Sequence, residues 1–357
     1  MNEVIRLGVI CDQFGNLQRG GAEAQVENTI AALQKTGLVS VEYITHETTD
    51  LSKFDLIHFF KSSFEYTPVA ITLAEKEIPY VVSTIIYPKN FRLEVLAYNL
   101  TRIFPKKLKS LLSISRRVQL WDKASALFPN TIDEAKFISN VTKNNFVKVV
   151  PNGLDLYEMT DVSKDLFETE YPFLKNRKFV LNVARVERRK NQKLLVQACK
   201  ELDMPVVVVG KIWDKKYYEE ILNIGYKECY FLGPIYNRKL LFSAYKSCSV
   251  FALPSTLETP GIAAMEAAFY NVPIVITRNG GTNLYFEDKA YYVDWRNMQE
   301  IKAGIIEMID KPVDTKQMIS NYSWDNIANM YVEMYKAICY KCCLLYTSPS
   351  PRDISGS

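Results

Sequence analysis

Two glutamates with seven residues between them mark the stretch of sequence richest in potential chemistry. Glu258 and Glu266 enclose Thr-Pro-Gly-Ile-Ala-Ala-Met. Pro260 and Gly261 are typical of the first turn of a helix, where free N–H groups and the helix dipole attract phosphate oxygens. A helix this apolar is expected to be buried, so its carboxylates need partners such as ligand hydroxyls. A second interpretation, in which the two acids only cap the helix and face water, stays open.

Two basic residues follow a strand-like run in the second half of the chain. The run 179–184 ends at Arg185, and Lys190 stands at the start of the next predicted helix. Both can face a cleft at the carboxyl end of the strand, where Arg offers a planar fork of donors and Lys a compact charge. Such a pair can neutralise a diphosphate leaving group. The adjoining Arg188 and Arg189 are expected to be solvated.

A glycine pair, Gly20-Gly21, follows the first strand-like run, 4–11. Its spacing from Gly15 copies the opening of a P-loop, but Gly21-Ala22 stand where Lys and Ser/Thr are required, which disfavours NTP hydrolysis. Glycines at a helix N-terminus let an anion or a sugar hydroxyl approach the backbone. A tight turn without a ligand is the alternative.

The two histidines give no sign of nucleophilic catalysis. His46 and His58 each follow or end a strand-like run, and neither is accompanied by a recognisable Ser or Cys nucleophile. A hydrolase triad therefore has little support. Both histidines are expected to be structural.

Six motifs together resemble the family 4 (group 1) glycosyltransferases of GT-B architecture, over approximately residues 4–340. Their order and separations carry the resemblance more than any one of them does. The motifs are Gly20-Gly21-Ala22-Glu23, Val150-Pro-Asn-Gly153-Leu-Asp155, Ala184-Arg185 with Lys190-Asn191, the Glu258/Glu266 pair, Asn279-Gly-Gly-Thr282, and Tyr322-Ser-Trp324 with Ile327-Ala.

The resemblance implies transfer of a sugar from a nucleotide-sugar donor with retention of anomeric configuration. It assigns the donor diphosphate to Arg185 and Lys190, the donor sugar hydroxyls to Glu258, and the ribose to Glu266. The donor site would also include Thr259, Pro260 and Gly261, and Gly20 and Gly21 would line the cleft. Cations and a helix N-terminus can stabilise a departing diphosphate. The sequence has no Asp-x-Asp, so neither a metal nor another cofactor is expected.

Three departures from the family pattern bear on function. Tyr87-Pro88 stand where the family often has a histidine near the reaction centre. Thr259-Pro260 replace a glycine-aromatic pair that is more common in the family. Asn283-Leu284 follow the Gly-Gly-Thr motif, after which the family pattern usually includes an acid. Two alternatives therefore stay open. One is a nucleotide-sugar epimerase of the same architecture, and the other is a catalytically inactive sugar-nucleotide-binding protein.

Short β-rich runs alternate with helical stretches throughout the chain, which predicts an α/β fold with parallel sheets covered on both faces. We expect two doubly wound Rossmann-like domains facing across a cleft, because ligands of such sheets bind at the carboxyl ends of strands. The predicted domains are 1–158, which would bind the acceptor, and 159–322, which would bind the nucleotide sugar. A helix at 323–340 would pack back on the first domain, and 341–357 would be a non-native or disordered tail.

Composition places the chain among globular proteins. Of its 357 residues, 48% are hydrophobic and 24% charged, which excludes wholesale disorder. No apolar run is long enough to span a membrane, and the N-terminus lacks the pattern of a secretory signal. The seven cysteines are mostly isolated, which favours reduced thiols. These features predict a cytoplasmic protein.

Positive charge is concentrated in the segment 89–121. It holds eight basic residues and one acid, against a net charge of +4 for the whole chain. Apolar and aromatic residues between the cations are typical of a helix at an anionic membrane surface. A lipid-linked acceptor and peripheral attachment to the inner face of the membrane are one interpretation, and an ordinary amphipathic helix pair with a solvated basic face is an equal alternative. No nucleic-acid recognition motif accompanies the charge.

Overall fold

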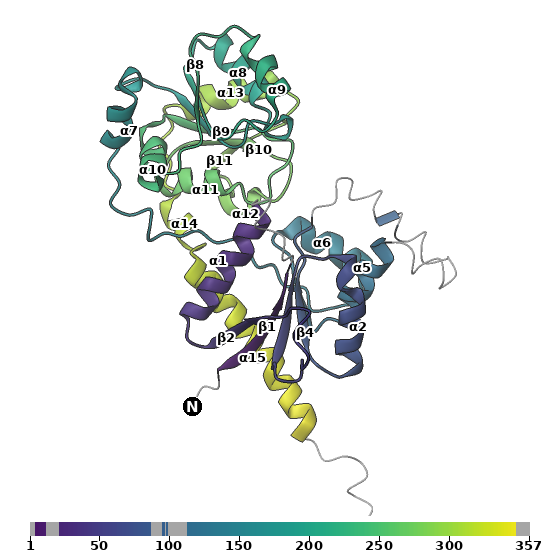
Figure 1. Ribbon diagram of the computed structural model, residues 1–357. Coiled ribbons are helices and arrows are strands. Elements are labelled where there is room, and N and C mark those ends of the chain that lie inside the picture. The colour runs from purple at the N-terminus through teal and green to yellow at the C-terminus, as the bar shows by residue number, and fades with distance from the viewer. Residues whose placement is uncertain (1–3, 12–20, 87–94, 97, 99–112, 348–357) are drawn as a thin grey trace, which may run out of the picture. The chain divides into compact units, whose positions relative to one another are not determined.

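The computed structural model describes residues 4–11, 21–86, 95, 96, 98 and 113–347 (Figure 1). The chain divides into two compact units. Unit 1 is Met1–Gly153 together with Trp324–Ser357, and unit 2 is Leu154–Ser323. Each unit is built on one parallel sheet, as the alternation of runs predicts.

Unit 1 contains a five-stranded parallel sheet in the order β2-β1-β3-β4-β5. Every residue of β3 is buried because helices cover both faces of the sheet. The strands are β1 (Ile5–Ile10), β2 (Val39–Tyr43), β3 (Leu56–Phe60), β4 (Tyr80–Ser83) and β5 (Ala126–Phe128).

The helices of unit 1 form two layers. Figure 1 shows α1 and α15 on one side of the sheet and α2, α5 and α6 on the other. Apolar side chains of each layer join a separate core, with Tyr331 and Tyr335 in the first and Trp121 and Phe137 in the second. The helices are α1 (Gly21–Lys35), α2 (Thr67–Glu75), α5 (Ser113–Asp122), α6 (Ile132–Val141) and α15 (Trp324–Thr347), with a 3-10 turn, η2 (Phe64–Tyr66).

The C-terminal helix α15 belongs to unit 1 and is longer than the sequence predicts. It begins at Trp324 and continues to Thr347, past the expected end at residue 340. Residues 341–347, predicted to open a disordered tail, are therefore helical. No helix breaker interrupts the chain before Ser348-Pro349, where the residue before a proline is disfavoured in a helix. Residues 348–357 lie outside the described part of the chain.

The boundary between the units falls at Gly153 and Leu154, rather than at the predicted 158. The amide of Leu154 donates to the carbonyl of Tyr322 at 2.7 Å. The two segments that connect the units are therefore hydrogen-bonded to each other. Met159 and Val162 are buried in the core of unit 2. The polar linker predicted from the sequence therefore begins inside the second unit.

Unit 2 contains a six-stranded parallel sheet in the order β11-β10-β9-β6-β7-β8. Its central strands are short, β-branched and fully buried, as in the four valines of β7. The strands are β6 (Val180–Val183), β7 (Val206–Val209), β8 (Cys229–Gly233), β9 (Val250–Leu253), β10 (Ile274–Thr277) and β11 (Ala290–Val293).

Alternate residues of these strands face two different cores. In β6, Val180 packs with the layer of α8, α9 and α13, and Leu181 with the layer of α7, α10 and α11 (Figure 1). The helices are α7 (Asp165–Glu170), α8 (Gln192–Glu201), α9 (Lys215–Leu222), α10 (Arg238–Ser247), α11 (Ile262–Phe269), α12 (Asn283–Phe286), α13 (Met298–Met308) and α14 (Lys316–Ser320), with 3-10 turns η3 (Pro172–Leu174) and η4 (Arg188–Lys190).

The strand order of unit 2 creates a switch point between β6 and β9. From β6 the chain proceeds to β7 and β8 on one side, and then returns to β9, β10 and β11 on the other. The connections that leave β6 and β9 therefore diverge at the carboxyl edge of the sheet. In doubly wound sheets this divergence is where ligands bind.

Candidate functional site

The switch point of unit 2 holds a buried ion pair. Lys190 ends η4, just after β6, and Glu258 follows β9. The Lys190 Nζ donates to Glu258 Oε1 at 2.5 Å, and the two side chains are 14% and 8% exposed. The structure thus brings together two of the predicted site residues. Burying both charges is costly unless they stay paired, so each one fixes the other.

A glycine holds the backbone of Glu258 in place. The amide of Glu258 donates to the carbonyl of Asn279, and the amide of Gly281 donates to the carbonyl of Glu258. Gly280, between them, has φ +116°, and a Cβ there would lie 1.9 Å from the Glu258 carbonyl oxygen. The Asn279-Gly-Gly motif therefore serves as a backbone support for Glu258.

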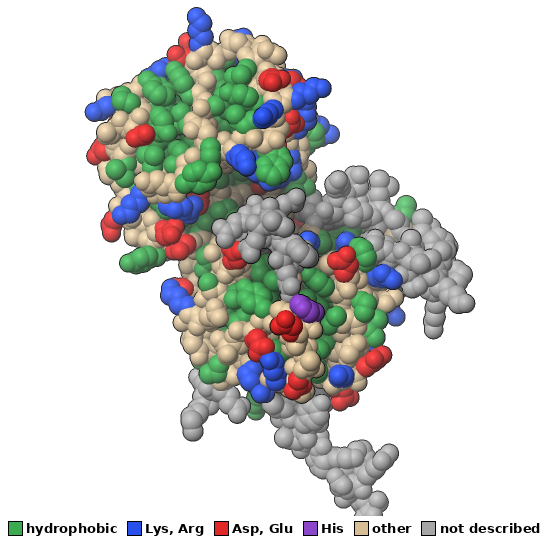
Figure 2. Space-filling model, in the orientation of Figure 1, with side chains coloured by type: hydrophobic (Ala, Val, Ile, Leu, Met, Phe, Trp, Pro, Cys, Tyr) green, Lys and Arg blue, Asp and Glu red, His purple; other side chains and the backbone are tan. Residues whose placement is uncertain are grey.

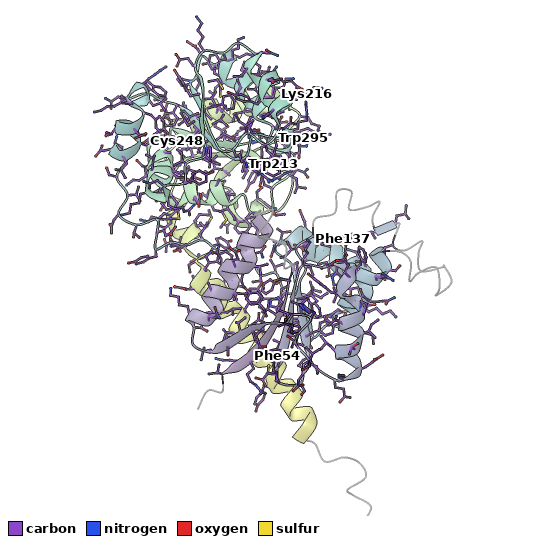
Figure 3. All side chains as sticks on the ribbon, viewed as in Figure 1. Phe54, Phe137, Trp213, Lys216, Cys248 and Trp295 are labelled. Atoms are coloured by element: carbon purple, nitrogen blue, oxygen red, sulfur yellow. The ribbon has the colours of Figure 1, made fainter. Side chains whose placement is uncertain are left out.

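Arg185 lies at the same edge but has different partners. Its guanidinium sits 4.9 Å from the centre of the Trp213 ring, and its Nη2 is 3.3 Å from Glu187 Oε1. Lys211 Nζ lies 5.8 Å from the same ring. Trp213 was not expected from the sequence, although a tryptophan between lysines shortly after a strand-like run is a signal for it (Figure 3).

Basic residues are gathered on this edge of unit 2. They follow four of its strands, with Arg185 and Lys190 after β6, Lys211 after β7, Arg278 after β10 and Arg296 after β11. Figure 2 shows Lys and Arg side chains on this part of the surface. Most of these cations pair with acids of the same unit, Arg185 with Glu187, Lys190 with Glu258, Arg278 with Glu300 and Arg296 with Asp294. The edge therefore carries both signs of charge.

The sequence predicts that Arg188 and Arg189 are solvated, but Arg189 also binds other residues of the protein. Arg189 Nη1 donates to the carbonyl of Leu257 at 3.1 Å and lies 3.9 Å from Glu258 Oε1. Arg188 instead pairs with Glu220 and is more than half exposed. Close approach of the connections after β6 and β9 gives Arg189 its carbonyl partner.

The helix after Glu258 begins at Ile262, so Pro260 and Gly261 directly precede it, although the sequence predicts them in its first turn. Gly261 is the residue before α11 and has φ +70°, a left-handed conformation that glycine adopts without steric cost. Pro260 and Gly261 are buried and Thr259 is half-buried. All three lie between Glu258 and the first turn of α11, where the helix dipole is positive.

Glu266 has its own protein partners. Its Oε1 accepts a hydrogen bond from Arg238 Nη2 at 3.0 Å, and its Oε2 accepts one from the Tyr245 hydroxyl at 2.7 Å. Burial and the adjacent carboxylate raise the pKa of Tyr245, so the hydroxyl stays a donor. Arg238 also binds Glu158. Neither Arg238 nor Tyr245 was expected from the sequence.

Both glutamates are buried, so the interpretation in which they only cap a helix and face water is wrong. The side chain of Glu258 is 8% exposed and that of Glu266 is 7% exposed. Each pairs with a cation from a different element, Lys190 for the first and Arg238 for the second. The two acids thus form separate charged centres, Glu258 before the start of α11 and Glu266 within the helix.

The predicted site residues of unit 1 lie largely outside the described residues. The structure does not describe Gly20, Tyr87 or most of the segment 89–121. Gly21 is described and is the first residue of α1. The structure does describe Glu134, a buried acid that the sequence analysis overlooked. It accepts hydrogen bonds from the Thr84 hydroxyl and from the amides of Ile86 and Asn130. Burial raises the pKa of Glu134 to about 7 against these bonds.

His58 is a buried structural residue, in line with expectation. Its two ring nitrogens lie 2.6 Å from the Tyr335 hydroxyl and 2.9 Å from Ser83 Oγ. Burial lowers the pKa of His58 to about 3, so the ring is neutral. His46, also expected to be structural, is instead an exposed side chain beside Glu47.

The described part of the chain contains neither a metal-ligating cluster nor a membrane-spanning helix. There, no three His, Cys, Asp or Glu side chains are grouped as a metal site would require. Within the same residues, no helix combines the length and apolar character of a membrane span. Cys199, Cys229 and Cys248 are free thiols, as predicted.

Comparison with solved structures identifies the architecture. Sucrose-phosphate synthase from Thermosynechococcus elongatus superposes with a TM-score of 0.71 at 15% identity, covering 94% of this chain and 100% of that one. HepE of Anabaena, solved with UDP and glucose, gives a TM-score of 0.64 at 19% identity, covering 97% and 100%. Together with the two doubly wound sheets, these likenesses define a GT-B fold.

Sequence comparison identifies the family. Residues 163–324 match the family described as glycosyl transferases group 1. An uncharacterized glycosyltransferase of Methanocaldococcus jannaschii is 28% identical over 217 residues, 55% of each chain. A D-inositol 3-phosphate glycosyltransferase of Corynebacterium urealyticum is 27% identical over 255 residues, 63% of this chain and 60% of that one.

Nearly all of unit 2, residues 163–324, therefore belongs to the group 1 glycosyltransferase family. The matched segment includes Arg185, Lys190, Glu258 and Glu266. The aligned region spans little more than half the length of the curated relatives.

Proposed function

We propose that this protein is a retaining glycosyltransferase that moves a sugar from a nucleotide-sugar donor to a saccharide or lipid-linked acceptor. The observation that carries the proposal is the buried Lys190–Glu258 pair at the switch point of a group 1 glycosyltransferase segment. Departure of a nucleoside diphosphate leaves negative charge on its oxygens. Preorganised cations stabilise that charge in the transition state.

Each charged residue of the site then has a distinct task. Arg185 and Lys190 neutralise the diphosphate, with Lys190 oriented by Glu258. Glu258 accepts hydrogen bonds from donor sugar hydroxyls, and Thr259, Pro260 and Gly261 lie against the same part of the donor. Glu266 binds the ribose while Arg238 and Tyr245 hold its carboxylate in orientation.

These residues supply charge stabilisation from side chains and a helix N-terminus, so we propose that transfer needs no metal. A chelator then leaves the rate unchanged. A uridine nucleotide sugar is the first donor to test, because HepE of Anabaena was solved with UDP-glucose. Polysaccharide or glycolipid assembly is the proposed setting.

The decisive experiment incubates the protein with a panel of nucleotide sugars, with and without candidate acceptors, with and without EDTA. Release of nucleoside diphosphate and sugar products are followed together. Acceptor-dependent release with an α-linked product from an α-linked donor supports retaining transfer. A changed sugar without release indicates an epimerase, and binding without either change indicates an inactive nucleotide-sugar-binding protein.

A further inference from the structure

Asn191, the residue after Lys190, has an uncommon backbone conformation. Its φ is +59° and ψ +31°, in the left-handed region that most side chains avoid. Its amide donates to the carbonyl of Arg188 and closes the η4 turn, and its carbonyl accepts from the amide of Leu195 as α8 begins. The conformation of Asn191 therefore sets the turn that carries Lys190.

The Asn191 side chain is buried and joins two other connections of the sheet. Its Nδ2 donates to the carbonyl of Pro254 at 3.0 Å and to the carbonyl of Trp295 at 2.6 Å. Pro254 follows β9, and Trp295 follows β11 (Figure 3). One carboxamide thus ties together the segments that leave β6, β9 and β11.

One of the two partners of Asn191, Pro254, lies in the segment that leads to Glu258. Pro254 is in the connection that carries Glu258, and the amide of Thr256 in that connection donates to the carbonyl of Arg189 at 2.8 Å. The turn of Lys190 and the loop of Glu258 are therefore held together by one backbone hydrogen bond as well as by their ion pair.

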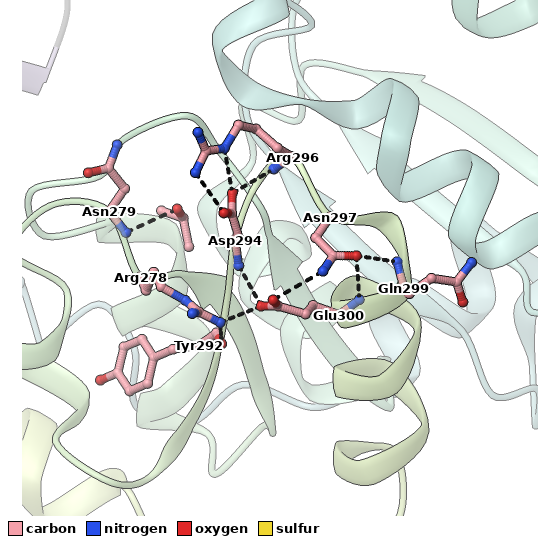
Figure 4. Close-up of polar contacts among 9 residues, drawn as sticks. Arg278, Asn279, Tyr292, Asp294, Arg296, Asn297, Gln299 and Glu300 are labelled. Carbon is pink, nitrogen blue, oxygen red and sulfur yellow. Dashed lines mark hydrogen bonds and ion pairs between the residues drawn. The ribbon is translucent and has the colours of Figure 1, made fainter.

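The Trp295 segment is supported by the polar network drawn in Figure 4. Asp294 accepts two bonds from the Arg296 guanidinium, and its amide donates to Glu300 Oε2 at 2.9 Å. Glu300 also accepts from Arg278, the residue before Asn279. The network therefore runs from the carbonyl partner of Asn191 to the loop that supports the Glu258 backbone.

We propose that Asn191 is a positioning residue that presents Lys190 to Glu258. Glycine would adopt the same backbone conformation but donate no side-chain bonds, and aspartate would place an acceptor against two carbonyls. Positioning of Lys190 does not depend on the ligand. The consequence for donor binding rests on the proposed function.

Lysine labelling tests the positioning without a ligand. The protein is treated with limiting acetic anhydride, and the acetylation rate of Lys190 is measured by peptide mass spectrometry relative to exposed Lys289. We expect N191G to raise the rate at Lys190 at least fivefold, because an unanchored turn releases the amine. An unchanged rate would overturn the proposal.

A second asparagine in the same unit offers a matched control. Asn271 also has a left-handed φ, +57°, and its Oδ1 accepts from the amides of Thr315 and Lys316. We expect N271G to leave Lys190 labelling unchanged while lowering the melting temperature. An equal rise at Lys190 in both variants would mean that Asn191 acts only through general stability, which contradicts the proposal.

Titration calorimetry with UDP, GDP and ADP separates this proposal from the proposed function. We expect N191G to weaken binding at least fivefold, and K190A and K190A/N191G to bind equally weakly, because Asn191 acts through Lys190. A further loss in the double variant would overturn positioning through Lys190. If the wild type bound none of the three, the proposed function would fail and the labelling result would still decide the role of Asn191.

Discussion

At the scale of single residues, the site is a set of charges fixed by buried partners. Lys190 is held by Glu258, and Glu266 is held by Arg238 and Tyr245. Buried charges stay ionised only when paired, so such pairs remain ordered before a ligand arrives. This preorganisation is what stabilisation of a leaving diphosphate requires.

Removal of either member of the central pair is expected to slow transfer. K190A and E258A should each lower turnover at least tenfold, about 1.4 kcal/mol of barrier. Initial rates with a saturating nucleotide sugar measure the effect. K193A is the matched control, since Lys193 makes an ion pair with Glu220 outside the candidate site. Near-wild-type rates in both site variants would remove the assignment.

At the scale of elements, the site depends on how loops meet beyond the ends of strands. Glu258 is positioned because its backbone pairs with the loop after β10, through an isolated bridge to Gly280. In unit 1, Glu134 on α6 similarly gathers the segments that follow β4 and β5. In each unit, one glutamate thus connects segments that follow two different strands.

A methyl group at Gly280 is expected to disrupt the Glu258 loop. G280A places a Cβ 1.9 Å from the Glu258 carbonyl oxygen, and φ +116° is itself unfavourable for alanine. We expect a loss of unfolding free energy of about 3 kcal/mol or more, with loss of activity in the folded fraction. Urea unfolding and initial rates measure the two effects.

Gly225 provides the comparison for backbone strain alone. It has φ +65°, and no atom lies within 4 Å of an added Cβ. G225A should therefore cost only about 1 kcal/mol and leave activity intact. If G280A and G225A behaved alike, the close approach to Glu258 would have no importance for the site.

The buried acid Glu134 is expected to make stability depend on pH. Its pKa is raised to about 7 in the folded protein from an ordinary value of 4.5, so the folded state holds a proton that the unfolded state releases between these values. The unfolding free energy therefore falls as pH rises from about 4.5 to 7, by on the order of 3 kcal/mol.

Urea unfolding of the wild type and of E134Q at several pH values between 4.5 and 8 isolates this contribution. The stability of the wild type relative to E134Q should decrease across the interval and level off above pH 7. A difference that stays constant, or that grows with pH, would show that burial does not raise the pKa of Glu134.

At the scale of the whole molecule, the chain builds the two doubly wound units of one GT-B fold and returns to the first unit through α15. Trp324 packs against Gly153, where an added Cβ would lie 2.6 Å from the indole ring. The first residue of α15 therefore packs against the last residue of the N-terminal segment of unit 1. The expected cleft between the two sheets stays a prediction.

The basic segment 89–121 is expected to bind anionic membranes. Reversing charge at Lys106, Lys107 and Lys109 should weaken binding to vesicles of anionic lipid about a hundredfold or more, measured by cosedimentation, because each basic residue near such a surface contributes about 1 kcal/mol. Neutral vesicles serve as the control. Equal binding of both proteins to anionic vesicles would count against a membrane-surface role.

The sequence alone determined the features that depend on contiguous residues. Alternating apolar runs predict the parallel strands, and the GT-B assignment and the candidates Arg185, Lys190 and Glu258 come from motifs a few residues long. Residue types and spacing carry this information because strand burial and loop chemistry are local properties. The structure places Lys190 and Glu258 together at the β6/β9 switch point.

Only the tertiary structure decided which side chains meet across the fold. Asn191 reaches Trp295, 104 residues away, because β11 and β6 end at the same edge of one sheet. Arg238 reaches Glu266 because α10 packs beside α11, and Glu134 finds its donors after β4 and β5. No local pattern specifies these pairs, since strand order and helix packing bring them together.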